Sequence, residues 1–143
     1  MDKNLKAASS VVLSSDRTAI WEVLLNPEKI KRFLFGAETI TNWNVGSSII
    51  FQGEFQGHPY KDKGVILDVR KEYLLSFSYW SGFSGLEDVP ENYSLVAYTL
   101  DEDPNGIRLT VTQTGFVNED GRQHSLHGWK QVLEKIKEIV EQK

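Results

Sequence analysis

The chain has 143 residues and a formal net charge of -4, and its 40% of hydrophobic residues suffices for the core of one domain. The acidic balance and the lack of a Lys/Arg cluster argue against a nucleic-acid partner. Cysteine is absent, which excludes disulfides, thiol nucleophiles and thiolate metal sites.

The N-terminus, MDKNLKAASSVVLSS, lacks the apolar run of a signal peptide. No segment has the length and apolarity of a membrane span. We therefore expect residues 1–143 to form one cytoplasmic domain that does not insert into membranes.

The first quarter of the chain predicts one strand and two short helices. Small and β-branched residues over 6–13 favour a strand, and residues 14–16 offer N-caps for a helix that begins near Arg17. Pro27 ends that helix and suits the first turn of a second one, where its missing N–H costs nothing. The apolar residues of the second helix that we expect to point inward are Ile30, Phe33 and Leu34.

From Gly36 to Thr114 the pattern is that of consecutive strands joined by short turns. Apolar and polar residues alternate with period two, for example where Val65, Leu67 and Val69 alternate with polar residues. Such sequential strands imply an antiparallel sheet. The predicted strands are 39–43, 49–55, 65–70, 75–79, 94–100 and 109–113.

Residues 81–92 are the one long irregular stretch, with two Gly, one Pro and three acidic residues. Loops of this length inside a compact domain are uncommon and often serve as lids or binding loops. The alternative is a disordered loop without a function.

Residues 118–143 predict a long amphipathic helix. Asn118 is a good N-cap, and Glu119 and Asp120 place negative charge at the positive end of the helix dipole. Apolar residues three and four apart form one face of this helix. They are Leu126, Trp129, Val132, Leu133, Ile136, Ile139 and Val140.

Two glycines, Gly121 and Gly128, lie inside this helix, although an interior Gly costs about 1 kcal/mol relative to Ala. One interpretation is that a sheet or a bound molecule approaches the helix closely at these positions. The alternative is a dented helix, or one that begins near Ser125.

The order of elements predicts an α+β fold in which a curved antiparallel sheet of six to seven strands wraps around the long C-terminal helix. One face of such a sheet needs a cover, and only this helix is able to supply it. Because a sheet curved around a helix does not close completely, a cavity between the two is the natural ligand site.

Several motifs are similar to those of one known family: RTAIWEVLLNPEKIKRF, TNWNVGSSIIF, YKDKGVILDV, IRLTVTQTGF and HGWKQVLEKIKEIV. In this order they resemble the START-like superfamily, also called SRPBCC or Bet v 1-like, which has the helix-grip fold. Within it the chain resembles the branch named after the activator of the ninety-kilodalton heat-shock chaperone ATPase. The resemblance implies two short helices after the first strand and a hydrophobic cavity against the C-terminal helix.

The activity of a family member does not follow from this resemblance. Members of the superfamily bind lipids, sterols, hormones and polyketides, and a minority are enzymes. The chaperone activators carry a second, N-terminal domain, for which we expect no room in 143 residues.

Aromatic residues are the strongest candidates for ligand contacts, since the predicted strand phases put them on the concave side together with Trp80. Gln113 shares that inward phase and could orient a ligand or pair with Tyr98 or Tyr79. The alternative is that the aromatic side chains simply fill a core. The predicted cavity residues are Trp43, Phe51, Phe55, Phe77, Tyr79, Tyr98, Gln113, His124, Gly128 and Trp129.

The sequence contains no catalytic or metal-binding constellation, and we expect neither a cofactor nor a metal. There is no G-x-S-x-G frame and no phosphate-binding loop. His124 and His127 lie three apart but lack an evident third ligand. Asp62 and Glu54 are expected to be surface charges that pair with Lys61 or Lys63, rather than an acid–base pair.

Three hypotheses follow. The first is a module that binds a small apolar or amphipathic molecule. The second is a co-chaperone-like domain that stimulates a chaperone ATPase. The third is a hydrolase or cyclase that uses His124 or a carboxylate in the cavity.

Overall fold

The computed structural model describes residues 1–142. Its element order confirms the predicted strand, two short helices, six strands and long helix. The elements are β1 (Asp2–Leu13), α1 (Arg17–Leu25), α2 (Pro27–Phe33), β2 (Glu38–Ile40), β3 (Ser48–Phe55), β4 (His58–Arg70), β5 (Leu74–Tyr79), η1 (Gly82–Ser84), η2 (Pro90–Asn92), β6 (Ser94–Asp103), β7 (Gly106–Phe116) and α3 (Glu119–Val140).

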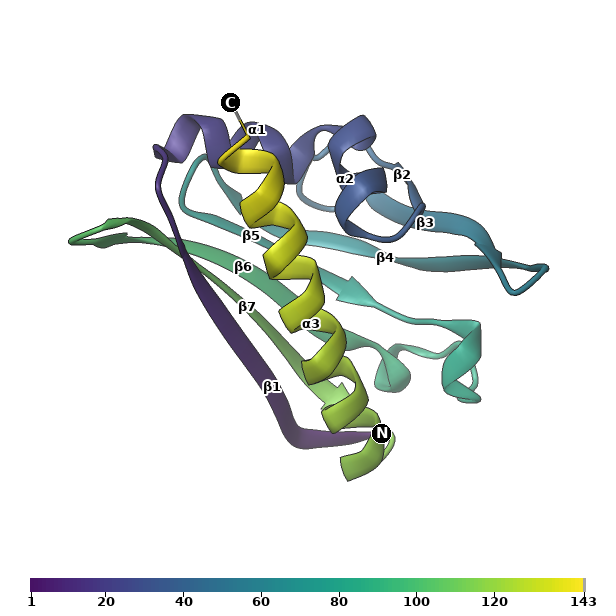
Figure 1. Ribbon diagram of the computed structural model, residues 1–143. Coiled ribbons are helices and arrows are strands. Elements are labelled where there is room, and N and C mark those ends of the chain that lie inside the picture. Colours follow the sequence, from purple (N-terminus) through teal and green to yellow (C-terminus); the bar gives the residue numbers. More distant parts are fainter. Residues whose placement is uncertain (143) are drawn as a thin grey trace.

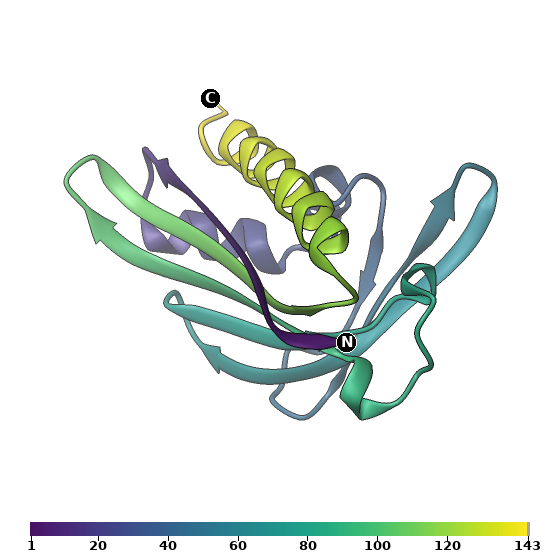
Figure 2. The same ribbon diagram turned by 90° about the horizontal axis from the view of Figure 1, so that it is seen from below.

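The strands form one seven-stranded antiparallel sheet in the order β1-β7-β6-β5-β4-β3-β2. The sheet curves around α3, with the β6–β7 hairpin on one side of the helix and the β3–β4 hairpin on the other (Figure 2). This confirms the helix-grip fold. Helix α3 packs mainly on β1 and also touches α1, α2 and β7 (Figure 1). Its position leaves the concave face of β3 to β5 without a helix packed directly upon it.

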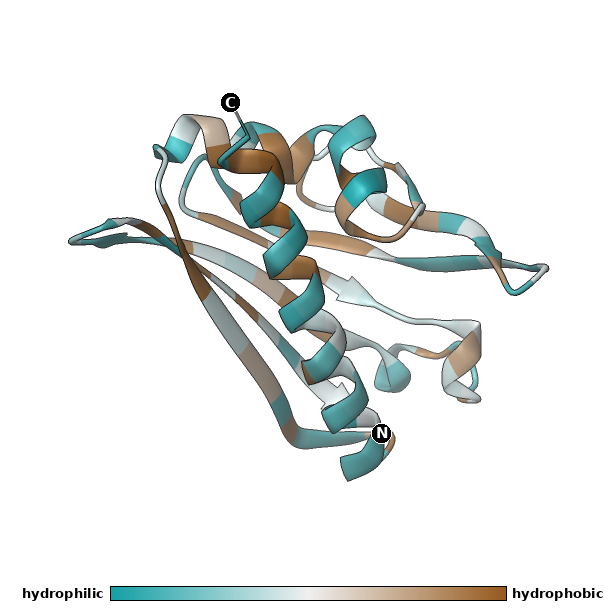
Figure 3. Cartoon of the chain, viewed as in Figure 1, coloured by the Kyte–Doolittle hydropathy of each residue, from teal (hydrophilic) through white to brown (hydrophobic). Residues whose placement is uncertain are grey.

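Helix α3 begins where the sequence predicts, because the side chain of Asn118 accepts a hydrogen bond from the backbone N–H of Gly121 at 2.9 Å. The alternative start near Ser125 is therefore wrong. Hydrophobic residues concentrate in its C-terminal half (Figure 3). The buried members of the predicted apolar face are Val132, Leu133, Ile136 and Ile139.

The pattern around β4 is where the prediction from alternation is wrong. Ile66 is fully buried, whereas Val65 and Leu67 are 40% and 44% exposed. The pairing of β4 with β5 shifts register between Ile66 and Asp68, as at a β-bulge. A β-bulge changes which residues of a strand face inward, so β4 carries apolar residues on both of its faces.

Other strand boundaries differ from the prediction as well, and β4 begins at His58 rather than near Val65. Strand β1 begins at Asp2 rather than near Lys6, since its first residues pair with the end of β7 after a register shift. The strand predicted over 39–43 ends at Ile40, and Trp43 has a φ of 65°, a left-handed conformation that does not continue a strand.

The segment 81–92 is folded, so the alternative of a disordered loop is wrong. It contains the short helices η1 and η2, and the indole of Trp80 donates to the carbonyl of Leu86 at 3.2 Å. Lys63 pairs with Asp88 of this segment. Trp80 therefore packs towards the loop and does not line the concave side, contrary to the prediction. No helix within residues 1–142 has both the length and the apolarity to cross a membrane.

Candidate functional site

A pocket of about 660 Å³ lies between α3 and the half of the sheet that the helix does not cover. Its volume falls within the range of about 300–1,000 Å³ that is typical of small-molecule sites. The structure places every residue predicted for the cavity in the wall of this pocket. They are Trp43, Phe51, Phe55, Phe77, Tyr79, Tyr98, Gln113, His124, Gly128 and Trp129.

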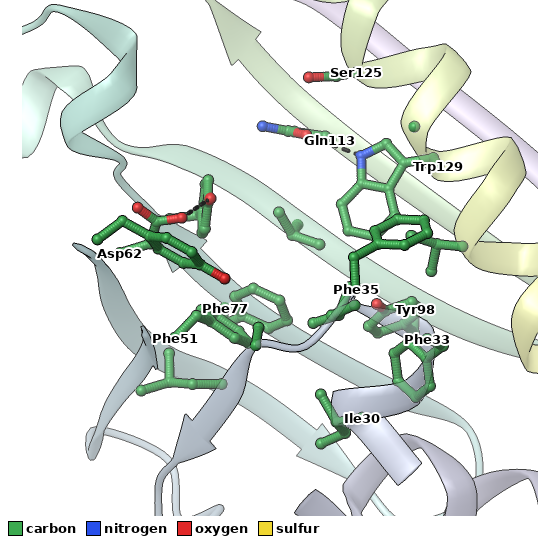
Figure 4. Close-up of a pocket in the computed structure, with 18 of the residues that line it drawn as sticks. Ile30, Phe33, Phe35, Phe51, Asp62, Phe77, Tyr98, Gln113, Ser125 and Trp129 are labelled. Atoms are coloured by element: carbon green, nitrogen blue, oxygen red, sulfur yellow. Dashed lines mark hydrogen bonds between the residues drawn. The ribbon is translucent and has the colours of Figure 1, made fainter. Parts of the chain in front are cut away.

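Aromatic side chains from three strands of the sheet form the floor of the pocket. The ring centroid of Phe51 lies 5.7 Å from that of Phe77 and 6.0 Å from that of Tyr79. These residues come from β3 and β5, where every second side chain faces the helix, and Tyr98 from β6 joins them (Figure 4). The period-two pattern thus brings distant aromatic residues together.

Helix α2 and the turn after it supply wall residues that the sequence analysis did not assign to the site. Ile30 and Phe33 were expected to point inward, and both line the pocket. Phe35 lines it from a turn in which its φ is 54°. The apolar pattern of α2 carried the signal for the first two, whereas nothing in the sequence pointed to Phe35.

A chain of hydrogen bonds holds the wall on the side of α3. The indole Nε1 of Trp129 donates to Gln113 Oε1 at 2.9 Å, and Gln113 Nε2 donates to Ser94 Oγ at 3.1 Å. The Ser94 hydroxyl donates to the carbonyl of Tyr79 at 3.2 Å. The alternative in which Gln113 pairs with the side chain of Tyr98 or Tyr79 is therefore wrong. These bonds satisfy both ends of a buried amide and fix the indole edge-on to Tyr98, with ring centroids 6.0 Å apart.

Gly128 faces open space, so the interpretation that the sheet approaches the helix closely there is wrong, whereas the approach of a bound molecule stays a prediction. A Cβ atom at Gly128 would have no atom within 4 Å. At Gly121 the nearest atom would be Asn118 Oδ1 at 3.6 Å, an ordinary contact. Gly128 lines the pocket, and its missing side chain enlarges the space between helix and sheet.

Asp62 is the main polar residue that the sequence analysis misplaced. It is 7% exposed and lines the pocket, so it is not a surface charge paired with a lysine. The error follows from the phase of β4: with Ile66 inward, Gly64 and Asp62 also face inward. Asp62 Oδ2 accepts a hydrogen bond from the Tyr79 hydroxyl at 2.5 Å, whereas Oδ1 has no partner among residues 1–142.

Burial changes the acidity of this pair. It raises the pKa of Asp62 above its usual value, and the neighbouring hydroxyls of Tyr79 and Ser81 oppose part of that change. Burial and the negative charge of Asp62 raise the pKa of Tyr79 well above its usual value. Tyr79 is therefore a hydrogen-bond donor over the whole physiological pH range.

Two of the three residues considered for acid–base chemistry lie at the edge of the pocket. Glu54 and His124 both line it, yet both are exposed, so neither has the desolvated surroundings of an interior acid or base. His127 contacts Gln131 at 3.3 Å on the same helix. Within the described part of the chain, no three side chains of His, Cys, Asp or Glu are grouped for a metal ion.

Three exposed phenylalanines surround the mouth of the pocket. Phe35, Phe55 and Phe83 are 60%, 57% and 61% exposed, and all three line the pocket. The ring centroid of Phe83 lies 6.0 Å from that of Phe55 and 5.9 Å from that of Tyr60. Segment 81–92 therefore contributes to the mouth, where a loop that acts as a lid would lie.

The sequence model of a family described as Activator of Hsp90 ATPase homolog 1-like protein matches residues 14–141. No curated protein matches the chain. The solution structure of ChR145 from Cytophaga hutchinsonii is 35% identical, with a TM-score of 0.82, over 99% of this chain and 97% of that one.

More distant structures share the fold. Protein CV1439 from Chromobacterium violaceum is 18% identical, with a TM-score of 0.79, over 97% of this chain and 99% of that one. The solution structure of the Aha1 dimer from Colwellia psychrerythraea is 14% identical, with a TM-score of 0.74, over 96% of both chains.

Proposed function

Because the chain belongs to the family of Activator of Hsp90 ATPase homolog 1-like proteins, we propose that it binds a small apolar or amphipathic molecule between α3 and the sheet. The family and the fold support a ligand-binding or co-chaperone-like domain. The pocket favours the first of these two roles.

The observation that carries the proposal is the open, largely apolar space beside Gly128. Ligands of drug-like size gain about 0.3 kcal/mol for each non-hydrogen atom. A molecule with about 20 such atoms would gain about 6 kcal/mol at that efficiency, which corresponds to a dissociation constant of about 40 μM. We therefore expect binding in the micromolar range.

The four tryptophans provide the experiment, because two line the pocket and two do not. The indole N–H resonances of Trp43 and Trp129 should shift when the neutral apolar probe N-phenyl-1-naphthylamine is titrated into the labelled protein. Those of Trp21, which is buried in the core, and Trp80 should stay in place. A titration that moves none of the four, or all four alike, would contradict the proposal.

The second candidate is a co-chaperone-like domain, and family membership is the observation that favours it. Its test is the ATPase rate of a purified Hsp90-type chaperone with and without this protein. A variant with the pocket filled, Gly128→Leu, separates the two roles: it should lose the small molecule but keep any stimulation that depends on the outer surface.

A further inference from the structure

The pocket contains one buried polar atom that has no hydrogen-bond partner among residues 1–142. This atom is Asp62 Oδ1, whose side chain is more than nine-tenths buried. The Ser81 hydroxyl lies near enough to oppose the rise in the Asp62 pKa, but no hydrogen bond joins it to the carboxyl in the structure. No ion pair within residues 1–142 includes Asp62. A buried carboxylate oxygen is costly without a donor, so this atom is available to a donor on a ligand.

Aromatic rings lie around this carboxylate. Phe51 is directly opposite Asp62 in the pairing of β3 with β4, and Tyr79 donates to its other oxygen. Tyr60, two residues earlier on the same side of β4, also lines the pocket, and burial together with the charge on Asp62 raises the pKa of Tyr60. The faces of such rings attract cations, most strongly where water is excluded.

The charges that line the pocket have one sign. They belong to Asp62 and, at the exposed edge, to Glu54, and no Lys or Arg lines the pocket within the described chain. The nearest lysines in the sequence do not neutralise Asp62: Lys61 is exposed on the other face of β4, and Lys63 pairs with Asp88. A ligand anion would therefore be repelled, whereas a cation would be attracted.

On the basis of the ligand-binding function proposed above, we propose that the pocket selects amphipathic amines. The ammonium group donates to Asp62 Oδ1 beside the rings of Phe51 and Tyr60. The apolar part of the ligand extends across the pocket towards Trp129, which lies on the opposite side from Asp62 (Figure 4). Gly128, the neighbour of Trp129 in α3, lines the pocket as well.

The test compares dodecylamine, dodecan-1-ol and dodecanoate, which share one chain and differ in the head group. Each competes with the naphthylamine probe at pH 7. The amine and the carboxylate are kept below their micellar concentrations, and the alcohol is kept below its solubility limit. A hydrogen bond to a charged group contributes about 1.5–3 kcal/mol. Dodecylamine should therefore bind about ten-fold or more tightly than the alcohol, and dodecanoate should bind most weakly.

Two variants that remove the same charge show whether Asp62 causes the preference for the amine. Asp62→Asn should lose the preference for the amine and bind dodecylamine and dodecan-1-ol with equal affinity. Asp68→Asn changes an exposed carboxylate of the same strand outside the pocket, and it should keep the full preference for the amine.

The possible failures are distinguishable. Equal binding of amine and alcohol by the unchanged protein, or a preference for the amine that survives in Asp62→Asn, would overturn the inference and leave the proposed function intact. If no member of the series displaces the probe or shifts the Trp129 resonance, the proposed function fails and the inference fails with it.

Discussion

Filling the space beside Gly128 should separate binding from stability. Most substitutions in a binding site weaken the fold or leave it unchanged, but Gly128 lies inside α3, where an added Cβ atom would have no neighbour within 4 Å. Replacing an interior Gly by Ala in a helix gains about 1 kcal/mol. At about 2.1 cal/mol/K of unfolding entropy per residue, this gain raises the melting temperature of a chain of this length by about 3 °C.

Gly128→Leu should combine that gain with an obstructed pocket. Its side chain extends into space that a ligand would otherwise occupy, so binding of the naphthylamine probe should fall by about ten-fold or more, as expected when contacts worth at least about 1.4 kcal/mol are lost. The measurements are urea unfolding for stability and the probe titration for binding. Gly121→Ala is the matched control, since it changes a glycine of the same helix outside the pocket and should leave binding unaltered.

Two results would refute this reasoning. If Gly128→Ala unfolds more readily than the unchanged protein, the position is not open. If Gly128→Leu folds normally and binds the probe as tightly as before, the ligand does not lie against α3.

The remaining predictions concern single side chains. The pKa of Asp62 is raised in the folded state, so its stabilising contribution is complete below its usual pKa of 3.8 and is lost as the pH rises through its pKa in the folded protein. Urea unfolding should therefore show Asp62→Asn to be more stable than the unchanged protein at pH 7. The difference should shrink at pH 3. An unchanged protein that is the more stable at pH 7 would count against the buried carboxylate. Gln113→Leu leaves the indole N–H of Trp129 without its acceptor and should cost about 1–3 kcal/mol in unfolding free energy, with faster hydrogen exchange of that N–H; unchanged exchange would disprove the bond. Ile136→Ala should lower the free energy of unfolding by about 2–5 kcal/mol, because this side chain is fully buried on the inner face of α3. Glu138→Ala, on the exposed face of the same helix, should change it by less than about 0.5 kcal/mol. Similar values for both variants would contradict the packing of α3.

The strands were predictable where alternation is regular. The period-two pattern implies that every second residue of a strand shares a face, and in β6 and β7 Val96 is buried together with Tyr98, and Leu109 together with Val111. β6 and β7 pair with each other over a long register without a shift, so the face that the local alternation assigns to each residue is the face it has in the folded sheet.

Two features of the site were not predictable for physical reasons. The bulge in β4 has no marker in the sequence, because Val65, Ile66 and Leu67 are all apolar and either phase places some of them inward. The wrong phase then placed Asp62 on the surface. Gly128 marked an unusual position in α3. A glycine in a helix, however, gives the same sequence pattern whether another segment packs closely against it or an empty space lies beside it, as it does here.

The pairing of β1 with β7 has a consequence for biosynthesis. Ala7 pairs with Gln113, and α3 then packs on β1, so the first strand has no partner until about a hundred further residues have left the ribosome. Contacts so distant along the chain make folding slow. A nascent chain that stalls before β7 therefore leaves β1 and one edge of β6 unpaired and open to water or to chaperones, and only the emergence of β7 joins the first strand to the sheet.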